Sequence, residues 1–160
     1  MAEKGREKIT LLAPDAQTAY RFRKALARHG LEVRERWVQF PRLDLKESSK
    51  STLDLVMSPL DRDRPDGLII ADDNLLEGAV EWLEQSGLCL PEELSVVTQN
   101  NFPHVIPSKV PLVRFGFEIP ALLEMLMDRL QKVAVGQDVA ENSIQSVISE
   151  EEFIKGSSVR

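Results

Sequence analysis

Short apolar runs alternate with amphipathic stretches along most of this chain. Lys8–Ala13, Leu68–Ala71 and Leu94–Val97 are too short for helices and are bounded by turn residues, which indicates strands buried between two layers. Between these runs, apolar residues recur at helical spacing, first over residues 15–29 and again over residues 72–86. Strands that alternate with helices predict an α/β fold with a parallel sheet and right-handed crossovers.

The remaining segments carry weaker or different patterns. Leu31–Phe40 alternates apolar and polar residues, which predicts a strand near the sheet edge, and a helix is expected between Leu43 and Leu60. Residues 102–111 hold three prolines and no periodicity, so we expect a long loop followed by a strand at 112–117. Glu118–Val135 has the most regular helical pattern, and 144–154 predicts one or two terminal strands.

Composition places the chain among ordinary globular proteins. Its 160 residues, of which 42% are hydrophobic and 29% charged, suit one domain or a fragment of a two-domain protein. The net charge of −6 argues against a surface that binds phosphate backbones. The single cysteine, Cys89, excludes an internal disulfide framework, and its apolar neighbours predict a buried position. No segment resembles a signal peptide or a membrane span, so we expect a cytoplasmic protein.

Two polar clusters follow neighbouring strands of the predicted sheet. Asp72 and Asp73 come directly after one buried run, and Asn100 and Asn101 follow the next. Open parallel sheets bind ligands at the carboxyl ends of their strands. These four side chains are therefore candidates for ligand binding, although Asp72 or Asp73 can also act simply as a helix N-cap, and the two asparagines can cap a turn.

An enzymatic interpretation depends on Asp72 and Asp73. Adjacent carboxylates suit Mg²⁺ and are similar to the acidic cluster of receiver domains. A receiver domain needs a further acidic pair after the first strand, where this chain has Ala13, Pro14 and Asp15. Glycine-rich phosphate loops, zinc-type spacings and the nucleophile elbow are all absent. We therefore expect no catalytic residues, no metal site and no cofactor.

Several segments, taken together and in order, resemble one family. The run Asp66–Ala79, the segment Pro91–Val97, the strand at Pro111–Phe115 and the end at Glu151–Ser158 are similar to segments of lactose/galactose repressor-type transcriptional regulators. The resemblance spans nearly the whole chain. It implies a three-layer α/β/α lobe with a mostly parallel sheet, of the type I periplasmic-binding-protein-like fold.

The resemblance also implies a function. In such regulators a small effector, often a sugar, binds between two lobes, and DNA is bound by a separate module that this chain does not contain. The chain then resembles the C-terminal lobe, with residues 1–160 forming one domain that binds an effector and forms a homodimer, without membrane contact. The helix at 117–136 is expected to pack on the missing lobe or on a partner lobe.

Three positions depart from the family pattern. Asp72 replaces an asparagine, Asn100 replaces an aspartate, and the family's sugar-contacting arginine falls near Thr18, with Arg21 one turn away. These exchanges suggest a neutral or cationic ligand, so the effector is expected to be a sugar or another small polar molecule. Two other hypotheses stay open: a Mg²⁺-binding receiver-like or enzymatic domain that uses Asp72 and Asp73, and a ligand-free protein-interaction domain.

Overall fold

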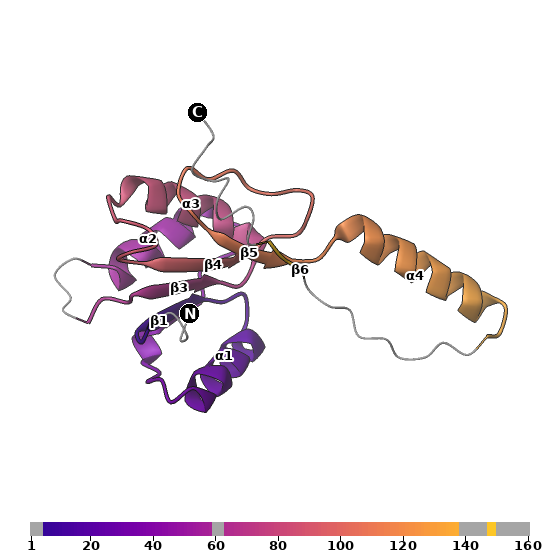
Figure 1. Cartoon of the computed structure of the whole chain (residues 1–160), viewed down its shortest axis with the longest axis horizontal. Coiled ribbons are helices and arrows are strands. Elements are labelled where there is room, and N and C mark those ends of the chain that lie inside the picture. Colours follow the sequence, from indigo (N-terminus) through magenta and orange to yellow (C-terminus); the bar gives the residue numbers. More distant parts are fainter. Residues whose placement is uncertain (1–4, 59–62, 138–146, 150–160) are drawn as a thin grey trace.

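A six-stranded sheet forms the centre of the computed structural model, which describes residues 5–58, 63–137 and 147–149. The strand order is β2-β1-β3-β4-β5-β6, and the first five strands are parallel, whereas β6 pairs antiparallel with β5 (Figure 1). The elements are β1 (Ile9–Leu12), α1 (Ala16–Arg28), η2 (Glu35–Trp37), β2 (Val38–Gln39), α2 (Lys46–Val56), β3 (Gly67–Ile70), η3 (Asp73–Leu75), α3 (Leu76–Gln85), β4 (Ser95–Gln99), β5 (Val113–Gly116), α4 (Ile119–Ala134) and β6 (Val147–Ser149).

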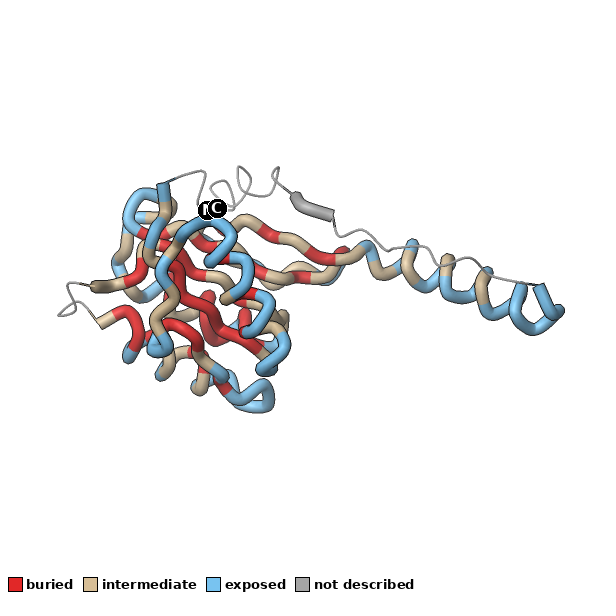
Figure 2. Tube along the Cα trace, turned by 90° about the horizontal axis from the view of Figure 1, so that it is seen from below, coloured by how far each residue is buried: buried red, intermediate tan, exposed pale blue. Residues whose placement is uncertain are grey.

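Two apolar clusters, one on each face of the sheet, make three layers. Helices α2 and α3 cover one face, where Leu53 and Leu83 pack against Leu68 and Ile70 of β3. Helix α1 covers the other face over β1 and β2, burying Phe22 and its neighbours (Figure 2). The expected α/β/α arrangement with a mostly parallel sheet is therefore confirmed.

The helix boundaries follow from local chemistry that the sequence carries. Asp15 caps α1 because its carboxylate accepts a hydrogen bond from the Thr18 amide at 2.7 Å. The helix ends at His29, and Gly30 takes a left-handed conformation with φ of +68°. Both boundaries agree with the sequence prediction.

One local prediction is confirmed only in part, and another is wrong. The edge strand predicted within Leu31–Phe40 is present as β2, but it has only two residues and follows a 3-10 turn. Leu31, Val33 and Val38 pack on the α1 cluster, whereas Trp37 packs on the cluster of the opposite face. Cys89 is exposed, because it lies in the loop between α3 and β4.

An ion network joins α2 to α3 across the outer surface. The Glu81 carboxylate accepts from Lys50 at 2.8 Å and from Lys46 at 2.9 Å. Hydrogen bonds from these two ammonium groups lower the pKa of Glu81 to about 2 from its ordinary value of 4.5, and Lys50 has the larger effect. A depressed carboxyl pKa adds stability that is fully present above the ordinary value and is lost as the pH falls through the folded-state value.

The acid sensitivity of the fold is therefore expected to come partly from Glu81. Between pH 5 and pH 2 (roughly the window that the two pKa values define), the thermal midpoint of Glu81→Gln should fall less steeply than that of the parent protein. Glu124→Gln, on α4 and away from this network, is the matched control and should keep the parental slope. Identical slopes for all three proteins in a pH series of thermal melts would contradict the expectation.

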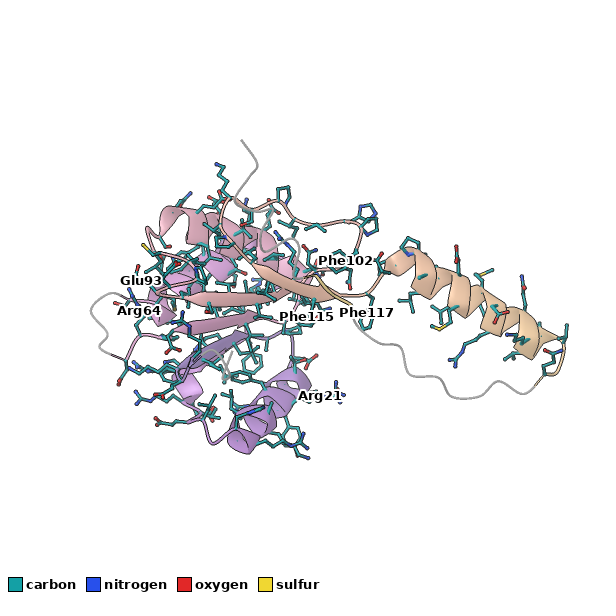
Figure 3. All side chains as sticks on the ribbon, viewed as in Figure 1. Arg21, Arg64, Glu93, Phe102, Phe115 and Phe117 are labelled. Carbon is teal, nitrogen blue, oxygen red and sulfur yellow. The ribbon has the colours of Figure 1, made fainter. Side chains whose placement is uncertain are left out.

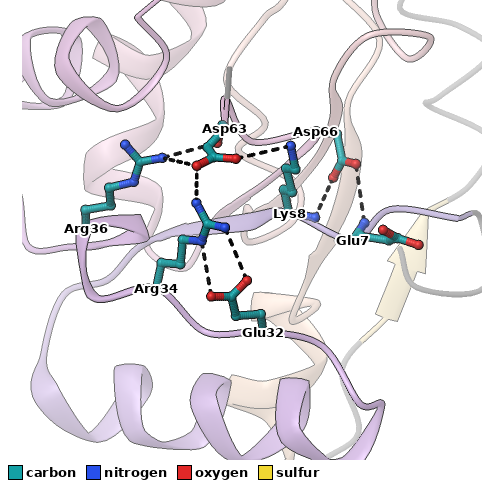
Figure 4. Close-up of polar contacts among 7 residues, drawn as sticks. All are labelled: Glu7, Lys8, Glu32, Arg34, Arg36, Asp63 and Asp66. Carbon is teal, nitrogen blue, oxygen red and sulfur yellow. Dashed lines mark hydrogen bonds and ion pairs between the residues drawn. The ribbon is translucent and has the colours of Figure 1, made fainter. Parts of the chain in front are cut away.

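A second group of charges holds the amino edge of the sheet. The Asp66 carboxylate accepts from the Lys8 amide at 2.9 Å, and Asp63 lies between Lys8, Arg34 and Arg36 (Figure 4). The Arg34 guanidinium lowers the pKa of Asp63. These charges pair with one another at the edge where the parallel strands begin, which is opposite to the edge where such folds bind ligands.

Helix α4 leaves the lobe at the carboxyl edge of the sheet. It projects away from the rest of the chain, and none of its residues is buried (Figures 1 and 2). In the part of the chain that the structure describes, no helix is long and apolar enough to cross a membrane. Of the terminal strands expected within 144–154, β6 is observed, and the rest of that segment lies outside the described residues.

Candidate functional site at the carboxyl edge of the sheet

The two polar clusters lie side by side at the carboxyl edge. Strands β3 and β4 pair from Gly67–Ser95 to Ile70–Thr98, so the residues that follow the two strands lie next to each other at the carboxyl edge. A hydrogen bond joins the two clusters, because the side-chain Nδ2 of Asn101 donates to Asp73 Oδ2 at 3.1 Å. The expectation that these clusters are neighbours is confirmed.

Asp72 caps the turn that begins the next helix. Its Oδ1 accepts from the Asn74 backbone amide at 2.9 Å and from the Asn74 side chain at 2.8 Å. The capping interpretation therefore holds for Asp72. Since Oδ1 makes both of these bonds and the side chain is only half-buried, a capping role is compatible with a ligand contact from the carboxylate.

Asn101 joins three strand ends. Besides its bond to Asp73, its Oδ1 accepts from the Phe117 backbone amide, at 3.2 Å, just beyond β5. The positions of Asp73 and of the chain that enters α4 are thus coupled through one half-buried amide side chain. A ligand that displaced the Asn101 side chain would therefore also affect Asp73 and the segment that enters α4.

Asn100 has a different environment from its neighbour. It is 1% exposed, and its side chain points into the loop that follows β4. The amide nitrogen donates to His104 O at 3.1 Å, and the side-chain oxygen accepts from the Ile106 amide at 3.0 Å. Arg114 of β5 donates to Ile106 O at 3.0 Å, so two buried polar residues hold this loop.

Arg21 is separate from this group. It lies on the exposed surface of α1 (Figure 3), and in the described ranges no hydrogen bond or ion pair joins it to any of the four candidates. Asp15 lies at the same edge, and its pKa is lowered, chiefly by the hydrogen bond from the Thr18 amide and slightly by Arg21.

The alternative that an asparagine caps the turn into the loop is confirmed for Asn100, whereas the sequence analysis did not indicate the part of Arg114. A signal was present: an arginine inside a strand of apolar neighbours must be paired when buried. The proline-rich segment that follows Asn100 also lacks backbone partners of its own, which favours a side chain that supplies them.

The carboxyl edge is acidic overall. Asp15, Asp72 and Asp73 end or follow β1 and β3, and Glu118 follows β5. In the described ranges, no group of three or more His, Cys, Asp or Glu side chains is placed to hold a metal ion. The arrangement offers carboxylate and amide oxygens to a polar ligand, without a nucleophile and base in contact.

The described chain is an α/β lobe with polar residues at one sheet edge and a helix that leaves from that edge. The model of the family described as periplasmic binding protein-like domain matches residues 1–159. The chain belongs to this family.

Solved structures with the same fold include several transcriptional regulators. The Escherichia coli transcriptional repressor ascG aligns with a TM-score of 0.74 and 17% identity over 93% of this chain and 56% of that chain. The transcription regulator CcpA of Lactococcus lactis aligns with a TM-score of 0.69 and 18% identity over 93% of this chain and 56% of that chain. A LacI family transcriptional regulator from Lactobacillus casei with bound sucrose aligns with a TM-score of 0.71 and 16% identity over 92% of this chain and 57% of that chain.

This chain therefore spans little more than half the length of these structures. The resemblance to repressor-type regulators that the sequence indicated is confirmed at the level of the fold. A comparison with curated protein sequences finds no significant match.

Proposed function

We propose that this chain is the effector-binding and dimerisation part of a transcriptional regulator. The observation that carries the proposal is the pairing of Asp73 with Asn101 beside the half-buried Asp72, at the edge where open α/β sheets bind ligands. The proposal is supported by regulators among the structures of the same fold, one of which holds sucrose. In this proposal DNA is bound by a separate domain, in the cytoplasm, and the chain is not an enzyme.

Effector binding would act by selecting one arrangement of the lobes. A ligand shifts such an equilibrium only by the difference between its affinities for the two arrangements. Asn101 suits this role because it contacts Asp73 on one side and the chain entering α4 on the other. A ligand held by Asp73 would therefore bias the path of α4, which is the element that leaves this lobe.

The effector itself is proposed to be neutral or cationic. Asp72, Asp73 and Asp15 supply carboxylates along the edge, and in the described part of the chain no hydrogen bond or ion pair joins Arg21 to the other candidates. A phosphorylated sugar would meet these carboxylates without a matched cation. Isothermal titration of the full-length protein with neutral sugars, amines and phosphorylated sugars compares the classes directly.

Asp72→Asn is expected to weaken binding of a cationic effector by about tenfold or more, because a charged hydrogen bond contributes about 1.5–3 kcal/mol. Asparagine is as good an N-cap as aspartate, so the thermal midpoint should not change. Glu92→Gln, at the opposite edge of the sheet, removes the same charge and should leave the titration unchanged. Tight binding of a phosphorylated sugar would contradict the cationic preference.

The Mg²⁺-dependent alternative has its own test. If Asp72 and Asp73 hold Mg²⁺, the ion should raise the thermal midpoint and Asp72→Ala should abolish that rise. The proposed function expects no Mg²⁺-dependent rise in either protein. A ligand-free interaction domain would instead give no ligand in a broad thermal-shift screen while still forming a tight dimer.

A further inference from the structure

The pairing of β4 with β5 continues beyond the ends of both strands. The Phe102 amide donates to Phe117 O at 2.9 Å, and the amide of Ile119, the first residue of α4, donates to Phe102 O at 3.0 Å. Phe102 and Glu118 therefore pair in parallel, as residues inside a sheet do. The chain enters α4 while it is still hydrogen-bonded to the segment that follows β4 (Figure 3).

One step of this pairing is closed by a side chain. The Asn100 amide donates to Phe115 O at 2.8 Å, which makes Asn100 O the regular acceptor for the Phe117 amide in a parallel ladder. In the described ranges, however, the Phe117 amide has no backbone acceptor and donates to Asn101 Oδ1 at 3.2 Å. Asn100 O lies instead against Gly116, where a Cβ would be only 2.3 Å away.

A side-chain acceptor can leave its donor, whereas a backbone acceptor inside a sheet cannot. The Asn101 side chain is half-buried, and its orientation depends on what holds its other polar atom. Its Nδ2 donates to Asp73 Oδ2 at 3.1 Å. This bond fixes the rotamer that presents Oδ1 to the Phe117 amide. Asp73 therefore acts on Phe117 without contacting it.

The start of α4 is thus held by two kinds of hydrogen bond. The backbone bonds of Phe102 do not involve Asp73. The bond from Phe117 to Asn101 depends on the Asp73 carboxylate, which is half-buried at the edge where open α/β sheets bind ligands. Only the second kind responds to what occupies Asp73.

We propose that Asn101 is a positioning residue that transmits the occupancy of Asp73 to the start of α4. While Asp73 is free, Asn101 Oδ1 closes the pairing at Phe117. A ligand donor that takes Asp73 Oδ2 releases Nδ2, so the Asn101 side chain turns away and the backbone bonds of Phe102 are left to hold the start of α4. The ligand at Asp73 rests on the proposed function, whereas the connection from Asp73 to Phe117 is tested without a ligand.

The test is amide hydrogen exchange of the whole chain, measured residue by residue by NMR. Asp73→Ala removes the acceptor oxygen, as an occupied Oδ2 would, and should speed exchange of the Phe117 amide about tenfold. The Phe102 and Ile119 amides keep their backbone acceptors and should exchange at the parental rate. Asp73→Asn is the matched control, because its side-chain oxygen still accepts from Asn101, and it should restore the parental rate at Phe117.

A second variant tests the connection without altering the turn after β3. Asn101→Ala removes the side-chain acceptor itself and should speed exchange of the Phe117 amide at least as much as Asp73→Ala. The amides of Leu68 and Ile69 in β3 should stay protected in every variant, which verifies that the lobe is folded.

Three results would overturn the proposal. Unchanged exchange of the Phe117 amide in Asn101→Ala or Asp73→Ala would show that the side chain does not hold this step. Equal acceleration at Phe102, Phe117 and Ile119 would show that the start of α4 opens as one unit. Rapid exchange at Phe117 in Asp73→Asn would assign the effect to the charge and not to the hydrogen bond. A chain with the expected exchange pattern that binds no ligand would refute the proposed function and keep the connection.

Discussion

Replacing Gly78 by alanine is expected to lower the free energy of unfolding by about 3 kcal/mol, although alanine is the better helix former. An alanine Cβ at this position would lie 2.2 Å from the Lys46 carbonyl oxygen and 3.1 Å from the carbonyl carbon. Both atoms belong to the backbone of α2, so no side-chain rotation relieves the overlap. Helices α2 and α3 would have to separate, opening the cluster around Leu53 and Leu83.

The sign of this effect makes it a sharp test. Helix propensity alone predicts a gain of about 1 kcal/mol for glycine to alanine within a helix. Urea unfolding of Gly78→Ala compares the two expectations directly. Gln85→Ala, on the exposed side of the same helix, should change stability by no more than about 0.5 kcal/mol. A stabilised Gly78→Ala protein would mean that the helices are not in the close contact described.

Gly78 also illustrates what the sequence can and cannot indicate. Periodicity places it inside a helix between turn residues, and that prediction is confirmed by α3. The distance between two helices depends on how both pack on the sheet, and no local pattern encodes it. The burial of residues such as Leu68 and Ile70 was predictable from the hydrophobic pattern, whereas the close approach of Gly78 to the Lys46 backbone was not.

The same distinction applies to the edge strand. Leu31–Phe40 shows real alternation, and Leu31 and Val33 do pack on the α1 cluster. β1 makes four pairs with β3 but only two with β2, so the length of β1 does not set the length of the edge strand. The residues before β2 instead follow a path on which Arg34 and Arg36 form ion pairs with Asp63, and the position of Asp63 is not visible within the segment itself.

The candidate site was predictable to the extent that it depends on topology. Consecutive strands of a parallel sheet are often neighbours, so Asp73 and Asn101 were expected to be close, and a hydrogen bond joins them. The separate orientations of Asn100 and Asn101 depend on the alternation along β4, which sends one side chain into the loop and leaves the other at the edge. The ligand roles of Asp72, Asp73, Asn100, Asn101 and Arg21 stay predictions.

Asn100→Leu should cost about 1–3 kcal/mol, because leucine fits the volume but removes the partner of the Ile106 amide, which is half-buried, and of the His104 carbonyl, which is more exposed. The Ile106 amide would lose its acceptor, and the His104 carbonyl would lose its donor. Each unsatisfied group costs about 1–3 kcal/mol when water cannot replace the partner. The loop from Phe102 to Pro111 would then keep its bonds from Arg114 and to Glu84.

Asn100→Asp separates the two hydrogen bonds. The carboxylate keeps an acceptor for the Ile106 amide but cannot donate to His104 O, and it adds a charge at a position that is 1% exposed. Its unfolding free energy should therefore improve as the pH is lowered toward the point where the carboxyl is protonated and can donate again. Asn100→Leu has no group to titrate and should show no such recovery relative to the parent protein. Urea unfolding at two pH values measures both variants, and equal pH responses would mean that the His104 bond contributes little.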